Sequence, residues 1–358
     1  MESDTNLLDQ PQRRRELDAS GMASHIQGLA QQCQQAWQLA QGFKLPAEFK
    51  RTKRVVVCGM GGSAIGGDLV QGLASLEGKP VIVHRDYGPP PFLDGDTLVV
   101  FCSYSGMTEE TLSAFEASID SPAKKLVLTS GGRLGELAKE RGIPHFPITY
   151  QSPPRAALGF TFIGLLGLLA KTGFLADKER DFGDMLQTLT RLNNQTGPEV
   201  PRNKNYAKEL AANLSGRVVV VYGASFLSGV ARRWKTQFNE NSKVWAFFDL
   251  IPELHHNSVV GFKLPEAETK DLFVLLLNSS VLSPSLHLRY RLTAQLLGQA
   301  GVGYRELKGE GEGVLSQMMS LVLWGDWVSY YLALLNGVDP SPNPAVDFLK
   351  QQLSQSKE

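Results

Sequence analysis

The stretch that decides the fold is VVVCGMGGSAIGG, at residues 55–67. It opens with a continuous apolar run of the kind found in buried parallel strands, and a glycine-rich turn, a serine and further small residues follow at once. The second half of the chain repeats this order at residues 218–230, where the sequence is VVVVYGASFLSGV. Both stretches indicate a strand, a glycine turn, a serine and a helix, which predicts an internal duplication.

Further short apolar runs extend the same rhythm through each half. They lie at residues 81–83, 98–101 and 126–128 of the first half, and at residues 244–247 and 272–277 of the second. The runs within each half are separated by enough residues for helices, and this alternation is typical of a parallel sheet covered by helices. We therefore predict an α/β fold with a parallel sheet in each half.

The length of 358 residues favours two domains, because a single core rarely grows beyond roughly 250–300 residues. Good helix formers near the start predict an N-terminal helical segment at 1–45. A turn-rich break at residues 193–201 then ends a first α/β domain at 46–195. The second domain takes residues 205–358 and closes with an aromatic-rich helix at 315–335, which could be a core helix or a contact between subunits.

The charge balance argues against partners that need a global electric field. Lys plus Arg and Asp plus Glu number 36 each, so nothing steers the whole chain onto nucleic acid or an anionic membrane. Cys33, Cys58 and Cys102 lack metal-ligand spacing, and we expect them to be reduced residues of the core or of a helix. The N-terminal region has no apolar stretch to act as a signal peptide, and the apolar run at 156–170 is too short to span a bilayer. We therefore expect a cytoplasmic protein.

A glycine-rich loop follows the first predicted strand, with the sequence GMGGSAIGGD at residues 59–68. Small residues there let backbone N–H groups approach an anion, and the positive end of the following helix adds attraction. A dinucleotide site and a plain tight turn have similar sequences, and no Walker lysine follows. Asp86, near the end of the next strand, keeps the dinucleotide alternative open.

A second loop carries several hydroxyl groups, with the sequence SYSGMTEET at residues 103–111 after another buried strand. Hydroxyls at the start of a helix can donate to phosphate oxygens alongside the backbone amides. The loop is therefore suited to a single phosphate monoester. A Ser/Thr helix cap with Glu in the first turn would use the same residues, so both interpretations stay open from this loop alone.

Together the two loops closely resemble those of sugar isomerase (SIS) domains, a doubly wound, flavodoxin-like fold that binds phosphosugars. The resemblance covers both halves of the chain and implies two SIS-type subdomains with parallel sheets, plus helical segments at the N- and C-termini. It also implies that the loops hold the sugar phosphate through Gly62, Ser63, Ser103, Ser105 and Thr108.

Two segments of the second half narrow the resemblance. QFNENSK at 237–243 and PELHHN at 252–257 are similar to segments of the bifunctional phosphoglucose/phosphomannose isomerases. That family interconverts glucose 6-phosphate or mannose 6-phosphate with fructose 6-phosphate. Its catalytic Glu and His fall on Glu240 and His256, and its arginine segment matches the one around Arg155.

The sequence departs from the family pattern at three positions. Met107 stands where related sequences often carry Asn in the hydroxyl-rich loop, and His255 occupies the usual Asn position beside His256. Ser341 replaces the commoner Thr of the closing segment and keeps the hydroxyl. In that segment, the resemblance implies that Ser341 and Lys350 approach the substrate.

The residue types themselves suit proton transfer between neighbouring carbons. A cis-enediol route needs a base that removes a proton from one carbon and returns it to the next, for which Glu240 is the candidate. Ring opening needs proton exchange at the ring oxygen and the anomeric hydroxyl, which suits His256 near neutral pH, and Arg155 would stabilise the enediolate as a fixed cation. Each has a structural alternative: a helix cap or surface ion pair for Arg155, a solvated helix-end carboxylate for Glu240 and a loop histidine for His256.

No metal or other cofactor is expected, because adjacent histidines point apart and no cluster supplies further ligands. The predicted partners are a hexose 6-phosphate substrate and a second copy of the chain, since the resemblance implies a homodimer whose ring-opening histidine enters the partner's active site. Two alternatives stay open. One is a phosphosugar-binding regulator, which would not need Glu240, His256 and Arg155, and the other is an amino-sugar phosphate isomerase or lyase on the same fold.

Overall fold

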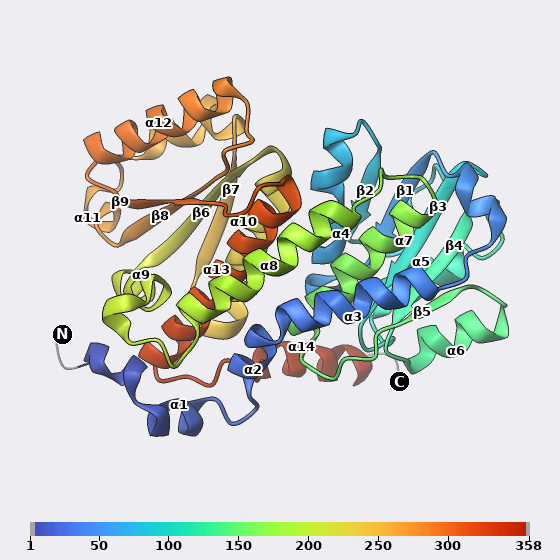
Figure 1. Ribbon diagram of the computed structural model, residues 1–358, viewed down its shortest axis with the longest axis horizontal. Helices are drawn as coiled ribbons and strands as arrows, with labels where there is room; N and C mark the ends of the chain where they lie inside the picture. The colour runs from blue at the N-terminus through green and yellow to red at the C-terminus, as the bar shows by residue number, and fades with distance from the viewer. Residues whose placement is uncertain (1–3, 356–358) are drawn as a thin grey trace.

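The computed structural model describes residues 4–355 and contains two parallel sheets, one in each half of the chain (Figure 1). The first sheet has the strand order β2-β1-β3-β4-β5, which is the flavodoxin-like order. The second repeats this order over four strands, as β7-β6-β8-β9, and every pairing is parallel. The predicted fold class is therefore confirmed, and the two halves repeat the same strand order.

The strands of the first sheet are β1 Arg54–Cys58, β2 Val81–His84, β3 Thr97–Cys102, β4 Lys124–Thr129 and β5 His145–Pro147. Those of the second sheet are β6 Val218–Ala224, β7 Ala246–Ile251, β8 Leu272–Asn278 and β9 Gly303–Lys308. The domain boundaries predicted from the sequence stay predictions. Residues 1–3 of the predicted segment 1–45 and residues 356–358 of the predicted domain 205–358 lie outside the described residues.

Helices precede, cover and join the two sheets. The N-terminal ones are η1 Asp4–Asp9, α1 Pro11–Leu17, α2 Met22–Gln27, α3 Leu29–Gly42 and η2 Ala47–Arg51. The first half adds α4 Gly61–Leu76, α5 Glu109–Ala117, α6 Gly132–Glu140, η3 Pro154–Ala156, η4 Gly159–Gly164, α7 Leu165–Lys171 and α8 Glu179–Thr196. The second half contains η5 Arg202–Lys204, α9 Tyr206–Leu214, η6 Ser225–Leu227, α10 Ser228–Gln237, η7 Phe238–Ser242, η8 Glu253–His256, η9 Ser258–Gly261, α11 Glu266–Thr269, α12 Pro284–Gln299, α13 Val314–Leu335 and α14 Pro344–Gln355.

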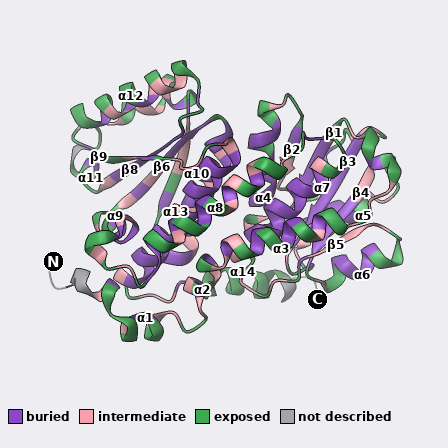
Figure 2. Ribbon diagram, viewed as in Figure 1, coloured by how far each residue is buried: buried purple, intermediate pink, exposed green. Residues whose placement is uncertain are grey.

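The alternation of side chains along β1 explains why helices cover both faces of the first sheet. Val55 and Val57 pack into the core that includes α4, while Val56 faces the opposite way, into a cluster with α5 and α6. Successive side chains of a strand point to opposite faces, so a continuous apolar run is needed where both faces are buried. Figure 2 shows this buried sheet beneath largely exposed outer helix faces.

Helix α13 forms the centre of the second half and touches α8, α9 and α10. It is long and apolar enough to span a bilayer by length and composition, yet 94% of its apolar window is buried inside the protein. Because water is excluded by the surrounding helices, α13 is a core helix. This decides against the alternative that the aromatic residues of this helix form a contact between subunits.

Buried Lys208 anchors the N-terminal segment to the second half. Its ammonium donates to the Asp9 carboxylate at 2.8 Å and, also at 2.8 Å, to the backbone carbonyls of Pro198 and Val200. Burial lowers the pKa of Lys208, an effect that the Asp9 partner opposes. A buried cation with these acceptors holds the chain that joins the two halves against the start of the protein.

The sequence-based boundaries were wrong at several elements. Residues 193–196 were assigned to a break, but α8 continues to Thr196, whose hydroxyl donates to the carbonyl of Leu192. Strand β7 begins two residues later than its apolar run. Strands β5 and β9 were not predicted, because β5 has only three residues and β9 (GYRELK) is a largely polar edge strand.

Candidate active site

The two predicted phosphate loops lie side by side at the carboxyl ends of β1 and β3. These strands are neighbours in the sheet, with Cys58 opposite Phe101. They form the topological switch point of this strand order, where doubly wound folds bind ligands. Ser63 Oγ accepts a hydrogen bond of 2.9 Å from the backbone N–H of Tyr104, which ties the first loop to the second.

Hydroxyl groups organise the second loop. Ser103 Oγ lies 2.8 Å from Thr108 Oγ1 and accepts from the N–H of Gly106 at 3.1 Å, while Ser105 Oγ accepts from the N–H of Met107 at 3.2 Å. Helix α4 begins just before Ser63, and α5 begins directly after Thr108. Two helix N-termini and the predicted hydroxyls therefore lie together at this edge of the sheet, an arrangement that can hold an anion.

Glycine is required at two points of these loops. Gly106 has a φ of 68°, in the left-handed region that glycine adopts without strain. A Cβ on Gly62 would lie 2.8 Å from the backbone nitrogen of Arg155 and 2.9 Å from its Cα. The glycine-rich loop therefore lies directly against the backbone of Arg155.

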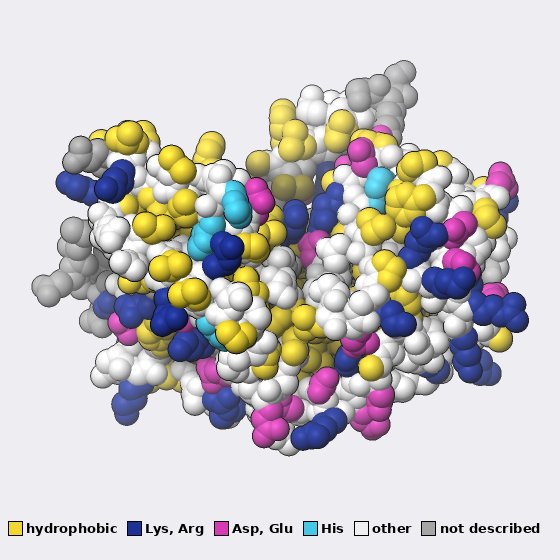
Figure 3. Space-filling model, turned by 90° about the horizontal axis from the view of Figure 1, so that it is seen from above, with side chains coloured by type: hydrophobic (Ala, Val, Ile, Leu, Met, Phe, Trp, Pro, Cys, Tyr) yellow, Lys and Arg dark blue, Asp and Glu magenta, His cyan; other side chains and the backbone are white. Residues whose placement is uncertain are grey.

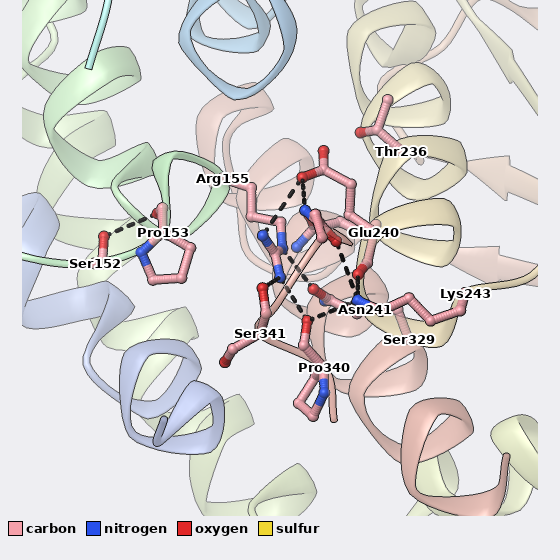
Figure 4. Close-up of polar contacts among 12 residues, drawn as sticks. Ser152, Pro153, Arg155, Thr236, Glu240, Asn241, Lys243, Ser329, Pro340 and Ser341 are labelled. Carbon is pink, nitrogen blue, oxygen red and sulfur yellow. Dashed lines mark hydrogen bonds and ion pairs between the residues drawn. The ribbon is translucent and has the colours of Figure 1, made fainter. Parts of the chain in front are cut away.

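Arg155 is the centre of the cluster drawn in Figure 4, and its side chain is 3% exposed. Its Nε donates to Asn241 Oδ1 at 2.7 Å, and one terminal nitrogen lies 3.4 Å from Glu240 Oε2. The other terminal nitrogen donates to the backbone carbonyls of Pro340 at 2.5 Å and Ser341 at 2.9 Å. A fully engaged guanidinium has no freedom to swing, so Arg155 is a fixed cation beside the Glu240 carboxylate.

Glu240 lies on η7, a π-helical turn that continues α10. Such turns are rare and are frequently found at functional sites. The Glu240 side chain is 30% exposed, whereas the neighbouring residues Asn241 and Ser242 are buried. Asn241 Nδ2 donates to Ser329 Oγ at 3.0 Å, and Ser242 Oγ donates to the carbonyl of Ser329 at 2.7 Å, so α13 fixes the turn.

Lys243 ends this turn in the left-handed conformation, with a φ of 58°. Its ammonium donates to the backbone carbonyl of Glu240 and, at 3.1 Å, to Asn343 Oδ1. Burial and the nearby Arg155 guanidinium lower the pKa of Lys243 to about 8. Burial likewise lowers the pKa of Arg155, an effect that the Glu240 carboxylate opposes. The cluster thus combines two cations with one carboxylate.

A buried ion pair between Arg233 and Asp326 holds the backbone of Arg155 in place. Arg233 on α10 donates to Asp326 on α13 at 2.8 Å and also to the backbone carbonyl of Arg155 at 3.2 Å. Gln237 donates to the other Asp326 oxygen at 2.8 Å. Because each acceptor here is buried and already bonded, the position of Arg155 is set by the packing of α10 on α13.

His256 is not part of this cluster. It is exposed on η8, and no hydrogen bond or ion pair within residues 4–355 joins it to Arg155 or Glu240. Its neighbour His255 instead bonds to α12, with Nε2 2.7 Å from Thr293 Oγ1. Throughout the described part of the chain, no group of three or more His, Cys, Asp or Glu side chains is placed to hold a metal ion.

The closing segment is divided between the cluster and the surface. Ser341 accepts from Arg155 through its carbonyl, and its hydroxyl is buried with no hydrogen-bond partner among the described residues. Lys350 is exposed on α14, and no bond to Arg155 or Glu240 is seen for it within residues 4–355. Sequence reasoning did not propose roles for Lys243 and Asn343. Lys243 lies in the quoted QFNENSK segment, whereas nothing in the local sequence distinguishes Asn343.

The equivalent loops of the second half are occupied by contacts within the chain. Phe226, just after β6, is buried, and its backbone lies against Gly72 of α4. Ser279 and Ser280, just after β8, both bond to the side-chain amide of Gln317, at 2.5 and 2.7 Å. The two halves therefore share a fold but differ in the loops at the carboxyl ends of their central strands.

Comparisons with known proteins agree with one another. Residues 203–353 match the family model described as the bacterial phospho-glucose isomerase C-terminal SIS domain. A bifunctional phosphoglucose/phosphomannose isomerase of Caldicellulosiruptor bescii is 36% identical over 94% of this chain and 100% of its own length. A protein of the same name from Aquifex aeolicus is 38% identical, over 84% of this chain and 90% of its own.

Among solved structures, a hypothetical protein of Thermus thermophilus matches with a TM-score of 0.75 and 19% identity. The match covers 97% of this chain and 94% of the other. A likeness at this level of identity concerns the fold alone. It extends over both sheets and the helices that join them.

Proposed function

The chain belongs to the bifunctional phosphoglucose/phosphomannose isomerases, and we propose that Glu240 and Arg155 carry its proton transfer. The protein is an aldose–ketose isomerase that acts on hexose 6-phosphates. The observation that carries the assignment of residues is the Arg155–Glu240 pair, in which a buried cation lies 3.4 Å from a partly exposed carboxylate. A sugar-binding regulator would need no enediol base.

In this proposal Glu240 removes a proton from one of the two neighbouring carbons, C1 or C2, and returns it to the other. Negative charge develops on the enediolate oxygens meanwhile, and the fixed guanidinium of Arg155 stabilises it without reorganising. His256 exchanges protons with the ring oxygen and the anomeric hydroxyl during ring opening. Glucose and mannose 6-phosphates differ at C2 and converge on one enediol, so the same groups serve both sugars.

The sugar phosphate is proposed to bind between the loops after β1 and β3, through Gly62, Ser63, Ser103, Ser105 and Thr108. Support comes from the hydrogen bond that joins the two loops and from the two helix N-termini that lie there. The contact between the glycine-rich loop and the Arg155 backbone supports a phosphate position close to the proposed reacting groups. Binding energy from the distant phosphate can then orient the carbons that react.

Replacing Ser103 by Ala tests this phosphate site. Removing one hydrogen bond to a charged group costs about 1.5–3 kcal/mol, so KM is expected to rise about tenfold or more, with kcat within about threefold. Initial-rate kinetics with fructose 6-phosphate measure both constants. The matched control is Ser118→Ala, a buried serine whose hydroxyl donates to the carbonyl of Phe115 at 2.9 Å. An unchanged KM in Ser103→Ala would contradict the proposed phosphate site.

Ser341 and Lys350 are proposed to contact the substrate from the closing segment. The buried, unpartnered hydroxyl of Ser341 supports its role, because buried polar atoms normally have a partner. The carbonyl of Ser341 also bonds Arg155, which places the residue next to the proposed reacting groups. Lys350 rests on the family resemblance alone. It would approach the substrate as a cation carried by α14.

We further propose a homodimer in which His256 acts in the partner's active site. The exposed position of His256, apart from the Arg155–Glu240 cluster, supports this arrangement. The neighbouring α12 exposes apolar side chains at helical spacing, and hydrophobic groups gather on this half in Figure 3. Exposed apolar residues of this face are Trp245, Phe247, Leu288, Leu292 and Leu296. A second copy that covers this face would bury them and bring its own His256 toward the first chain.

Mixing two inactive variants tests the shared site. Glu240→Gln and His256→Ala homodimers are unfolded, combined in equal amounts and refolded together. Each mixed dimer then holds one intact site, so about a quarter of the wild-type activity is expected to return. If each site used only its own chain's residues, mixing would restore nothing. Refolded wild type, treated identically, supplies the reference activity.

A cytoplasmic location is proposed on two grounds. Cys33, Cys58 and Cys102 are all buried free thiols, as expected from the sequence. Free thiols without disulfides are usual in reducing compartments. The hexose 6-phosphate substrate is also a charged metabolite that does not cross a bilayer unaided.

A further inference from the structure

Asn343 in the closing segment joins Lys243 to Glu240. Its Nδ2 donates to Glu240 Oε2 at 3.0 Å, and its Oδ1 accepts from Lys243 Nζ at 3.1 Å. Lys243 also donates to the backbone carbonyl of Glu240. These hydrogen bonds therefore close a ring that runs from Glu240 Oε2 through Asn343 and Lys243 to the backbone carbonyl of Glu240.

The chemistry of the ring fixes which way the Asn343 amide faces. A lysine ammonium can only donate, so the amide oxygen must face Lys243. The amide NH2 then faces Glu240, and an ionised carboxylate can only accept. If the amide were flipped, its NH2 would face the Lys243 ammonium, which is also a donor. Its oxygen would then face the Glu240 carboxylate, which is also an acceptor. The Lys243 ammonium thus determines that Asn343 offers a donor to Glu240.

Asn343 uses its side chain here rather than at its own helix. It immediately precedes α14, the position where an Asn side chain ordinarily accepts from the first helical amides. The N–H groups of Val346 and Asp347 instead bond the Asn343 backbone carbonyl, at 2.9 and 3.1 Å. Within residues 4–355, the side-chain bonds of Asn343 go to Lys243 and Glu240. The side chain therefore forgoes a cap that ordinarily stabilises a helix.

The two oxygens of Glu240 consequently differ. Oε2 receives Asn343 Nδ2 at 3.0 Å and lies 3.4 Å from Arg155, whereas no described hydrogen bond reaches Oε1. Figure 4 shows one carboxylate oxygen held by the dashed contacts and the other pointing away from them. An oxygen that already accepts two charged or polar donors is a weaker base than its free neighbour.

We propose that Asn343, oriented by Lys243, is a positioning residue that anchors Oε2 of Glu240 and leaves Oε1 to carry the proton between the substrate carbons. The inference rests on the proposed role of Glu240 as the base. Charged groups on other elements also face the ring. They are Arg155 on η3 and Asp339 in the loop after α13, while Arg233 on α10 and Asp326 on α13 act on Arg155, and none of these four changes in the variants below.

The first test compares Asn343→Leu with Asn343→Asp. Leucine fills a similar volume without the donor, so the carboxylate can rotate away, and kcat is expected to fall about tenfold with KM within twofold. Aspartate places a second carboxylate against Oε2. In the plot of kcat against pH, the acidic limb is then expected to move about one pH unit upward, because a second negative charge disfavours the ionised form of Glu240. Gln352→Leu, an exposed change on the same helix, serves as control.

A double-variant cycle tests whether Lys243 acts through Asn343. Lys243→Met alone is expected to lower kcat about fivefold, and the Lys243→Met/Asn343→Leu double variant about as much as Asn343→Leu alone. Independent roles would instead multiply the two losses to about fiftyfold. Thermal unfolding of each variant shows whether a loss of kcat comes from a loss of folded protein.

The inference is overturned if Asn343→Leu keeps wild-type kcat, or if Asn343→Asp leaves the acidic limb in place. It is also overturned if the effects of Lys243 and Asn343 multiply. These outcomes differ from failure of the proposed base. If Glu240→Gln remains active, the base assignment fails, whereas an inactive Glu240→Gln beside a fully active Asn343→Leu removes only the positioning role.

Discussion

Glu240→Gln is expected to lower kcat by about 10³-fold or more for both glucose 6-phosphate and mannose 6-phosphate, with KM nearly unchanged. The amide has almost the size of the carboxylate and can still accept from Arg155 and Asn343, so the cluster should keep its geometry. It cannot take up a proton from carbon. Proton transfer should therefore stop while substrate binding continues.

The measurement is fructose 6-phosphate formation from each sugar in the presence of a chelator. Wild type is expected to be fully active under these conditions on both sugars. Glu240→Asp should lie between wild type and Glu240→Gln, at about 10² below wild type, because it moves the base by about 1 Å. Glu136→Gln on the exposed face of α6 is the matched control. More than a tenth of wild-type activity in Glu240→Gln would exclude this residue as the base.

Arg155→Lys is expected to lower kcat/KM by about 10²–10³-fold. Lysine keeps the charge but has one nitrogen in place of three. It therefore cannot donate to Asn241, Glu240 and the two carbonyls of the closing segment at the same time. The developing enediolate would lose a cation held in one place. The loss should appear mainly in kcat, because the loops proposed to bind the phosphate at the other end of the substrate are unchanged.

The same substitution should also reduce the free energy of unfolding, by about 2–3 kcal/mol. Breaking a buried ion pair ordinarily costs about 3–5 kcal/mol, and the lower figure reflects the partial exposure of Glu240. Urea unfolding measures this change, with Arg133→Lys on the surface as control. Wild-type stability together with wild-type kcat/KM in Arg155→Lys would contradict both roles.

Much of the fold followed from apolar runs, since buried parallel strands leave a continuous signal. The run at residues 55–58 became β1 nearly unchanged. Strand β9 left no such signal, because Tyr304, Arg305 and Glu306 lie on an edge strand where exposure tolerates polar residues. The end of α8 was misplaced for a related reason. Asn193 is a typical turn residue, yet here its side chain accepts from Trp327 Nε1 at 3.0 Å, a tertiary contact that the local sequence does not reveal.

The candidate site was predictable only in part. Glu240 and Arg155 were singled out one at a time, but they are 85 residues apart, and only the packing of α10 on α13 brings them together. Asn343 could not be identified at all, because an Asn before a Pro predicts a turn or a helix cap. Its role depends on which side chains meet it across the fold.

The difference between the two halves also bears on how many ligands one chain can hold. The backbone of Phe226 lies against Gly72 of α4, and the side-chain amide of Gln317 bonds the hydroxyls of Ser279 and Ser280. A ligand could reach the loops after β6 and β8 only by breaking these contacts within the chain. The repeated architecture is therefore expected to bind one phosphosugar per chain rather than two.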